Sequence, residues 1–286
     1  MIDWPEDLIK QVTRKNIILF VGAGASMGCK NSSGESPLSW DNLLIELSTE
    51  FCKTTEAKQE FESIIEHKDY LLAAEYLRYI ASDTGNINHY NDKIDTLCNG
   101  PSNDPFRPSE LHYNLIDLEP SVIVTTNFDS ILEEATAGGW ASVQFYDAHI
   151  DNSIRQGRNV LLKIHGTAKH AGKIVFTQSE YTSLRNEGSL ALEVLQSLLL
   201  TKMALFVGYS FNDPDLKLIL ESLFGVTGRG PGHVLVMDGD IPHFRRRLFT
   251  EIYGLTVKSF PKGKYDSLLE SIVELRGALA STTTGS

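Results

Sequence analysis

The sequence predicts a doubly wound α/β fold, with a mainly parallel six-stranded sheet and a helical lobe inserted into it. Short, uninterrupted apolar runs recur along the chain, which is typical of strands buried on both faces of a parallel sheet. Amphipathic segments follow most of these runs, and strand–helix alternation of this kind is the mark of an α/β fold. The six expected strands are residues 17–21, 121–126, 159–164, 204–209, 233–238 and 255–260.

The helices expected after these strands have apolar residues at helical spacing. Together with the strands they predict a Rossmann-like sheet, which binds its ligands at the carboxyl ends of the strands. The helices are expected after the second, fourth, fifth and sixth strands, at residues 129–137, 213–224, 242–254 and 264–279.

The stretch between the first two strands has a different pattern. Residues 39–118 contain successive helical segments, far more than a single crossover needs. Ser39 and Ser109 stand where N-caps are expected, because serine side chains accept hydrogen bonds from the free amides of a helix start. We interpret this stretch as an inserted helical lobe. Its expected helices are residues 39–52, 57–67, 70–82 and 109–118.

One domain is therefore expected over residues 1–280. Its Rossmann-like core comprises residues 14–28 and 119–278, and its helical insert spans about residues 39–118. Residues 281–286 have no apolar anchors, so a disordered tail is expected there.

Composition and charge exclude several classes of protein. With 286 residues, 42% of them apolar, the chain can bury a sizeable core. No apolar run is long enough to span a membrane, and the acidic N-terminus lacks the apolar stretch of a signal peptide, so we expect a cytoplasmic protein without membrane contact. The formal charge of -11 favours no direct binding to nucleic acid. The basic run Arg245–Arg247 is interpreted as a solvated face or a local anion clamp.

Several catalytic signatures are missing from the sequence. Cys29, Cys52 and Cys98 are widely spaced and form no CxxC pair, and the histidines form no HxxxH or HExxH pattern. Neither a metal site nor a zinc module is therefore expected. Phosphate-loop NTPases and serine hydrolases are also disfavoured, because GxxxxGK[ST] and GxSxG are absent.

Glycine-rich or polar turns follow four of the expected strands. They are GAGAS at residues 22–26, TTNFD at 125–129, KIHG at 163–166 and GYSFNDPDL at 208–216. Each turn has an ordinary structural explanation: a tight turn, a helix N-cap or a structural histidine. The glycines do not complete GxGxxG either, because Met27 stands at the position of its last glycine. However, the carboxyl ends of parallel strands share one edge of the sheet, so together the four turns predict one ligand site.

The ordered set of motifs resembles the sirtuin superfamily, and more closely the sirtuin-like domains of bacterial antiphage defence systems. The likeness runs from residue 16 to about residue 275. It implies NAD as the ligand. The cofactor-binding residues carried over from the family motifs are Gly22, Ala23, Gly24 and Ser26 for the phosphates and ribose, Thr126 in the place of a sirtuin glutamine, and Gly208, Ser210 and the nearby Asp213 for the adenosine side.

The resemblance also implies three catalytic residues. Asn127 would orient a water or a ribose hydroxyl, and Asp129 would hold the nicotinamide carboxamide. His165 would act as the general base, a role that suits histidine because its side chain titrates near neutral pH.

The chain departs from protein-deacylating sirtuins in two places. It lacks their four zinc cysteines, and SPLSW, with Pro37 and Trp40, stands where they carry GIPDFR. The resemblance therefore favours NAD cleavage with water as the acceptor, giving nicotinamide and ADP-ribose. In a defence setting this reaction would deplete cellular NAD.

Alternatives from other functional classes stay open at this stage. The chain could be an NAD-dependent deacylase or ADP-ribosyltransferase, or a module that senses NAD or ADP-ribose without cleaving it. The resemblance also implies a homo-oligomer, and a partner defence protein such as a HerA-type ATPase or an Argonaute.

Overall fold

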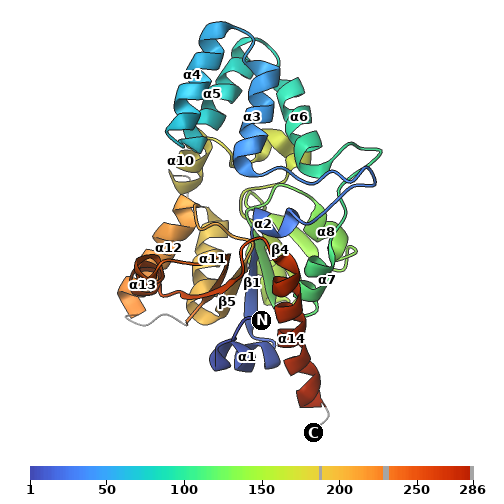
Figure 1. Cartoon of the computed structure of the whole chain (residues 1–286), viewed down its shortest axis with the longest axis vertical. Coiled ribbons are helices and arrows are strands. Elements are labelled where there is room, and N and C mark those ends of the chain that lie inside the picture. Colours follow the sequence, from blue (N-terminus) through green and yellow to red (C-terminus); the bar gives the residue numbers. More distant parts are fainter. Residues whose placement is uncertain (187–188, 228–231, 284–286) are drawn as a thin grey trace.

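A parallel sheet forms the centre of the molecule (Figure 1). The computed structural model of the chain describes residues 1–186, 189–227 and 232–283. Within these residues the sheet has seven strands in the order β3-β4-β2-β1-β5-β6-β7, and every neighbouring pair is parallel. The strands are β1 (Ile17–Val21), β2 (Val122–Thr125), β3 (Ala141–Gln144), β4 (Val160–Lys163), β5 (Met203–Val207), β6 (Val234–Asp238) and β7 (Thr256–Phe260).

The predicted doubly wound parallel fold is confirmed, but the expected count of six strands is wrong. The strand that the sequence did not reveal is β3, at the edge of the sheet beside β4. It reads ASVQ, and only Val143 is buried. An edge strand of this composition has no continuous apolar run, which was the pattern used to find the other six.

Helices cover both faces of the sheet because its central strands are buried on both sides. All five residues of β1 are buried, and successive side chains point to opposite faces. Ile18 and Phe20 join one apolar core, and Ile17 and Leu19 join the other. The first core is covered by α9 (Ile150–Arg155), α11 (Leu190–Thr201), α12 (Pro214–Thr227) and α13 (His243–Tyr253). The second is covered by α1 (Glu6–Thr13), α7 (Glu110–Ile116), α8 (Ile131–Ala135) and α14 (Tyr265–Thr283).

Four further helices form a lobe with its own apolar core, in which Leu44, Leu77 and Tyr90 are buried. They are α3 (Trp40–Phe51), α4 (Thr55–Glu66), α5 (Tyr70–Asp83) and α6 (Ile87–Asn99). The lobe lies beyond the short helix α2 (Ala23–Ser26), which follows β1 (Figure 1). The sequence reading did not include α6, although its buried Tyr90 and Ile94 stand four residues apart, as on one face of a helix.

The expected helix starts at two serines are present. α3 begins directly after Ser39, whose side chain makes no capping hydrogen bond, and α7 begins directly after Ser109. The Ser109 amide donates to His112 Nδ1 at 3.4 Å. α7 packs on the face of the sheet with α14 rather than in the core of the lobe.

The basic run in α13 is held locally. The guanidinium group of Arg246 donates to the Val257 carbonyl and to Ser259 Oγ, both at 2.9 Å, and so links α13 to β7. Arg247 pairs with Glu251 one turn along the same helix. These contacts favour a structural role over an anion clamp.

Two further predictions concern membrane spans and the C-terminal tail. No described helix is long and apolar enough to cross a membrane. α14 runs to Thr283, and the last three residues of the predicted tail lie outside the described residues.

Candidate functional site

The four motif turns meet at one edge of the sheet because their strands end in register. Val21 of β1 pairs with Thr125 of β2 and with Val207 of β5, and Thr125 pairs with Lys163 of β4. The residues that follow these four therefore emerge side by side at the carboxyl edge. β2 and β5 flank β1 on opposite sides, so the order in which strands are added to the sheet reverses at β1. Doubly wound sheets bind their ligands at this kind of switch point.

The glycine-rich turn after β1 is locked against the turn after β5. The Gly22 amide donates to the Val207 carbonyl at 2.9 Å, and the Gly24 amide donates to the Gly208 carbonyl at 2.8 Å. A Cβ on Gly22 would stand 2.5 Å from the Gly208 oxygen, and a Cβ on Gly208 would stand 2.2 Å from the Ala25 nitrogen. The glycines are thus required by the packing of the two turns as well as by any ligand.

The accessible part of these turns is small. Ala23 and Ser210 are exposed, Gly24 and Gly208 are half-buried, and Gly22 is buried. Because the Gly24 amide already donates to a carbonyl, Ala23 and Ser210 are the predicted ligand contacts that face solvent.

Asn127 and Asp129 lie together with Ser26 in a first buried cluster. Ser26 Oγ donates to Asp129 Oδ2 at 3.0 Å, and Asn127 Nδ2 donates to Ser26 Oγ at 3.2 Å. The three residues are between 2% and 8% exposed. Asn127 Oδ1 is buried without a hydrogen-bond partner among the described residues. Leaving a buried carbonyl oxygen without a hydrogen bond costs free energy, so a partner is expected for this atom. A ligand or a water could donate that hydrogen bond.

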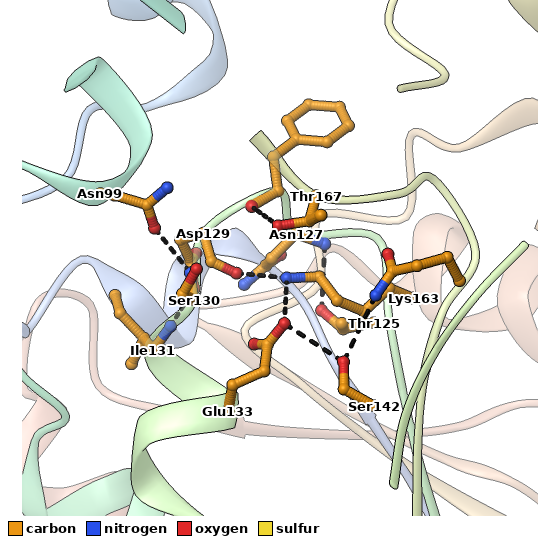
Figure 2. Close-up of polar contacts among 12 residues, drawn as sticks. Asn99, Thr125, Asn127, Asp129, Ser130, Ile131, Glu133, Ser142, Lys163 and Thr167 are labelled. Carbon is orange, nitrogen blue, oxygen red and sulfur yellow. Dashed lines mark hydrogen bonds and ion pairs between the residues drawn. The ribbon is translucent and has the colours of Figure 1, made fainter. Parts of the chain in front are cut away.

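The turn that carries Asn127 has a well-defined framework (Figure 2). Thr125 Oγ1 donates to the Val21 carbonyl at 2.7 Å and accepts from the Asn127 amide at 3.0 Å. Asp129 Oδ1 accepts from the Ile131 amide at 3.1 Å, at the start of α8. Asp129 therefore fixes the turn directly before α8, whose N-cap is Ser130, while its other oxygen joins the cluster. Thr126, the residue before Asn127, is half-buried.

His165 stands in a second buried cluster with Asp213 and Tyr181. His165 Nε2 lies 3.1 Å from Asp213 Oδ2, and its Nδ1 lies 3.4 Å from the Tyr181 hydroxyl. That hydroxyl donates to Asp213 Oδ2 at 3.0 Å. The His165 and Tyr181 rings meet edge to face, with centroids 5.0 Å apart. Both nitrogens of the buried histidine thus face protein groups.

Asp213 is placed by its own helix. Its Oδ1 accepts from the Leu216 amide at 2.8 Å, as the cap of α12. The structure therefore brings Asp213, predicted from sequence as a cofactor-binding residue, onto the catalytic-histidine candidate. Tyr181 lies on α10 (Gln178–Asn186) and was not predicted, because nothing in the local sequence of that helix distinguishes it from a core tyrosine.

The two clusters are connected through the backbone between them. The Phe128 carbonyl, inside the TTNFD turn, accepts from the Ala168 amide at 2.9 Å and from Thr167 Oγ1 at 3.4 Å. Both donors follow His165 directly, after Gly166, whose φ of +82° permits the sharp turn. The Asn127–Asp129 turn and the His165 turn therefore form one packed unit.

Burial and pairing move the two carboxyl groups in opposite directions. Desolvation raises the pKa of Asp129, and the charge of Lys163 and hydrogen bonds from Ile131 and Ser26 counter this only in part. Burial would also raise the pKa of Asp213, but the facing His165 ring and the hydrogen bonds it receives hold that pKa below its usual value. Asp213 is thus the more firmly ionised of the two.

The structure offers no alternative centre for metal chemistry among the described residues. No group of three or more histidine, cysteine, aspartate or glutamate side chains could hold a metal ion there. Cys29 and Cys52 are buried and Cys98 is partly buried, and all three are free thiols.

A cavity of about 480 Å³ lies away from both clusters. It opens between α6 and the 3-10 helix η1 (Ala168–Lys173), and neither Asn127 nor His165 lines it. Asn127, Asp129 and His165 are all at least nine-tenths buried, so little of their surface is open to a ligand.

Comparison with known proteins supports the family resemblance. A family model described as a SIR2-like domain matches residues 121–258, which include three of the four motif turns. The NAD(+) hydrolase ThsA of Acinetobacter baumannii is 25% identical over 218 residues, covering 76% of this chain and 41% of that protein. ThsA of Bacillus cereus is 25% identical over 223 residues, with the same coverage of each chain. Defense-associated sirtuin 2 of Bacillus subtilis is 23% identical over 141 residues, covering 46% of this chain and 14% of that protein.

The chain spans about two fifths of the length of the ThsA relatives it matches. The family match includes Asn127 and Asp129 of the first cluster and all three residues of the second, whereas Ser26 precedes it. The resemblance predicted from the ordered motifs is confirmed: residues 121–258 are similar to the SIR2-like domain, and the chain is similar to NAD(+) hydrolases named ThsA and to a defence-associated sirtuin.

Proposed function

We propose that the chain hydrolyses the bond between nicotinamide and ribose in NAD, releasing nicotinamide and ADP-ribose. The observation that carries this proposal is the unpaired, buried Asn127 Oδ1, which stands beside Asp129 at the edge where His165 also lies. The names of the ThsA relatives support the same reaction.

Each cluster supplies a part of that reaction. The bond breaks through an oxocarbenium-like ribosyl state, and nicotinamide leaves as a neutral pyridine that keeps the bonding electron pair. Asp129 would accept a hydrogen bond from the carboxamide of the leaving group, and Asn127 Oδ1 would accept one from the attacking water. Holding both partners in line lowers the barrier because they no longer have to find each other.

The second cluster would handle the proton. Once the Tyr181 hydroxyl, which donates to Asp213 in the structure, has moved away from Nδ1, Asp213 at 3.1 Å from Nε2 would favour the tautomer with the proton on Nε2 and a free lone pair on Nδ1. Water adds its oxygen to the ribosyl carbon, and its proton passes to Nδ1. Because the Tyr181 hydroxyl lies 3.4 Å from Nδ1, it must shift to admit the substrate.

The remaining predicted residues would hold the dinucleotide. We assign Ala23 and Ser210 to direct contact with the phosphates and ribose, since they are exposed. Gly22, Gly24 and Gly208 would allow the backbone to approach, Ser26 would orient Asp129, and Thr126 would line the nicotinamide end.

The biological role that follows is a defence effector of the cytoplasm that depletes NAD when activated. Regulation through a homo-oligomer or through a partner protein such as a HerA-type ATPase or an Argonaute is part of the same proposal. The support for it is the naming of one relative as a defence-associated sirtuin.

Nicotinamide release by purified protein tests the reaction. We expect release by the wild type, and a loss of about a hundredfold or more in Asn127→Ala and His165→Ala, the usual size of a general-base contribution. Asn152→Ala and His243→Ala replace exposed residues of the same types and should behave as wild type. Measurements at several protein concentrations reveal activation by self-association.

The outcomes separate the alternatives. Unchanged release in both site variants would remove the assigned residues from the mechanism. NAD binding without nicotinamide release at any concentration would favour a sensing module. Nicotinamide release only in the presence of an acyl-lysine or acceptor protein would favour a deacylase or an ADP-ribosyltransferase.

A further inference from the structure

Lys163 is a fully buried lysine at the end of an otherwise apolar strand. It is the last residue of β4 and is 0% exposed. Lysine is almost never buried completely unless it is paired, because its charge loses the hydration of bulk water. Because Lys163 lies two residues before His165, the contacts that allow its burial bear on the site.

Its ammonium group holds both ends of a short segment (Figure 2). Nζ donates to the backbone carbonyl of Asp129, and it donates to Glu133 Oε1 at 2.9 Å. Glu133 lies in α8, which begins directly after the Asp129 turn, and its Oε1 also accepts from Ser142 Oγ at 3.3 Å. Lys163 therefore attaches β4 to the turn and to the helix that follows it.

The neighbouring backbone groups are also held by hydrogen bonds. The Phe128 carbonyl accepts from the Ala168 amide at 2.9 Å, and the Ser130 amide donates to Asn99 Oδ1 at 2.7 Å. With Lys163 on the Asp129 carbonyl, three consecutive residues of the turn are held. Two of the three holding groups belong to the segment of chain that carries His165.

We propose that Lys163 is a positioning residue, which fixes the Asn127–Asp129 turn against the strand that carries His165 and faces Asp129 with a positive charge. This inference rests on the proposed NAD hydrolysis. The charge has a second consequence, because burial raises the pKa of Asp129 and Lys163 acts in the opposite direction. Removing the charge should make Asp129 harder to ionise and its carboxylate a poorer acceptor for the carboxamide.

Lys163→Met tests the proposal, because methionine keeps the length of the side chain without its charge. We expect kcat for NAD to fall by about ten- to a hundredfold, the cost of a small displacement of reacting groups, with a smaller change in KM. The acidic limb of the pH profile should move to higher pH. A carbon-13 titration of the Asp129 carboxyl, assigned with Asp129→Asn, should show the same rise without any need for activity.

A double variant separates positioning from folding. Lys163→Met with Glu133→Leu replaces the buried ion pair by apolar groups, an exchange that commonly preserves stability. We expect this variant to fold and to remain impaired in kcat, and it carries the test if the single variant does not fold. Lys202→Met is the matched control. This partly buried lysine donates to Asn16 Oδ1 at 3.0 Å, at the amino ends of β1 and β5 and therefore far from the turns of the site. Its loss should leave the pH profile unchanged.

A folded Lys163→Met variant with wild-type kcat and an unshifted Asp129 titration would overturn the inference and leave a purely structural ion pair. For the double variant kcat alone decides, because Glu133 raises the pKa of Asp129 while Lys163 lowers it. If the wild type releases no nicotinamide, the proposed function fails on its own. The Asp129 titration then still decides whether Lys163 controls this carboxyl group.

Discussion

Asp213 contacts a helix and a catalytic candidate at the same time. One carboxylate oxygen caps α12 through the Leu216 amide, and the other lies 3.1 Å from His165 Nε2. The sequence predicted the cap and a place at the ligand edge, because an aspartate before Pro214 is a typical helix start. It could not predict the contact with His165, since that depends on how β4 and α12 meet in space.

Asp213→Asn should lower NAD turnover by about a hundredfold or more, because an amide N–H facing Nε2 favours the wrong imidazole tautomer. Asparagine still caps α12, so the fold should be kept. Tyr181→Phe is the graded comparison. It keeps the ring packed on His165 and removes only the hydroxyl, and we expect less than about a tenfold loss. Steady-state kinetics of the two variants measure the difference, and equal activities in Asp213→Asn and wild type would contradict the assigned role.

The same carboxylate makes a specific prediction for stability against pH. The pKa of Asp213 in the folded protein is lower than the usual value of 3.8. The ionised Asp213 therefore contributes its full stabilisation above pH 3.8, and this contribution is lost as the pH falls through the pKa of the folded state. The stability gap between wild type and Asp213→Asn should therefore shrink below about pH 4. Urea unfolding at a series of pH values measures the gap, and a gap that widens in acid would show the opposite linkage.

Other residues of the site left weaker signals in the sequence. Lys163 is visible as a charge inside an apolar run, which marks it as paired or functional, although its partners Asp129 and Glu133 could not be named. Tyr181 left no signal, because a tyrosine in an amphipathic helix is normally part of the core.

At the scale of elements, the turn after β1 and the turn after β5 form one interlocked unit. From the sequence, the glycines of both turns are predicted to contact the ligand, because glycine allows the backbone to approach a phosphate closely. The structure adds that each glycine leaves no room for a side chain, because a Cβ on Gly22 would meet the Gly208 oxygen and a Cβ on Gly208 would meet the Ala25 nitrogen. Packing between two distant turns leaves no pattern in either one, so it could not have been predicted.

Gly208→Ala should destabilise the protein by more than about 3 kcal/mol, which is beyond the usual effect of a single substitution. The new Cβ would stand 2.2 Å from the Ala25 nitrogen, at a φ of +67°. Gly138→Ala is the control, because Gly138 has a φ of +71° with nothing within 4 Å, and only the backbone strain of about 1–2 kcal/mol applies. Thermal unfolding distinguishes them, and equal losses would show that the interlock contributes nothing.

The elements missed by sequence analysis share a physical reason. β3 lies at the edge of the sheet with one buried residue, and α6 is a mostly polar helix with two buried residues. Neither needs the long apolar pattern that marks a fully buried element. The five inner strands do have it, which is why their positions were predicted to within a residue or two. β7, the other edge strand, has two buried residues and was found from its shorter run.

At the scale of the whole molecule, the lobe reaches the site through aromatic contacts. Trp40, at the start of α3, packs against Phe128 and Phe176, with ring centroids 6.1 Å and 4.9 Å apart. Phe128 lies between Asn127 and Asp129, so the lobe touches the turn that carries both. The sequence predicted the lobe as an insert, but its contact with this turn depends on tertiary packing.

The buried state of the site also belongs to this scale. Asn127, Asp129 and His165 are covered in the structure, and the ThsA relatives are more than twice the length of the region they share with this chain. The proposed activation by self-association predicts that nicotinamide release per molecule rises with protein concentration.

The most direct test of the central claim is to run the reaction in oxygen-18 water and identify the products by mass spectrometry. Hydrolysis at this site predicts nicotinamide and ADP-ribose in equal amounts, with one heavy oxygen in each ADP-ribose. Both products should be absent with Asn127→Ala. Nicotinamide without labelled ADP-ribose, or labelled ADP-ribose made equally well by Asn127→Ala, would contradict the account.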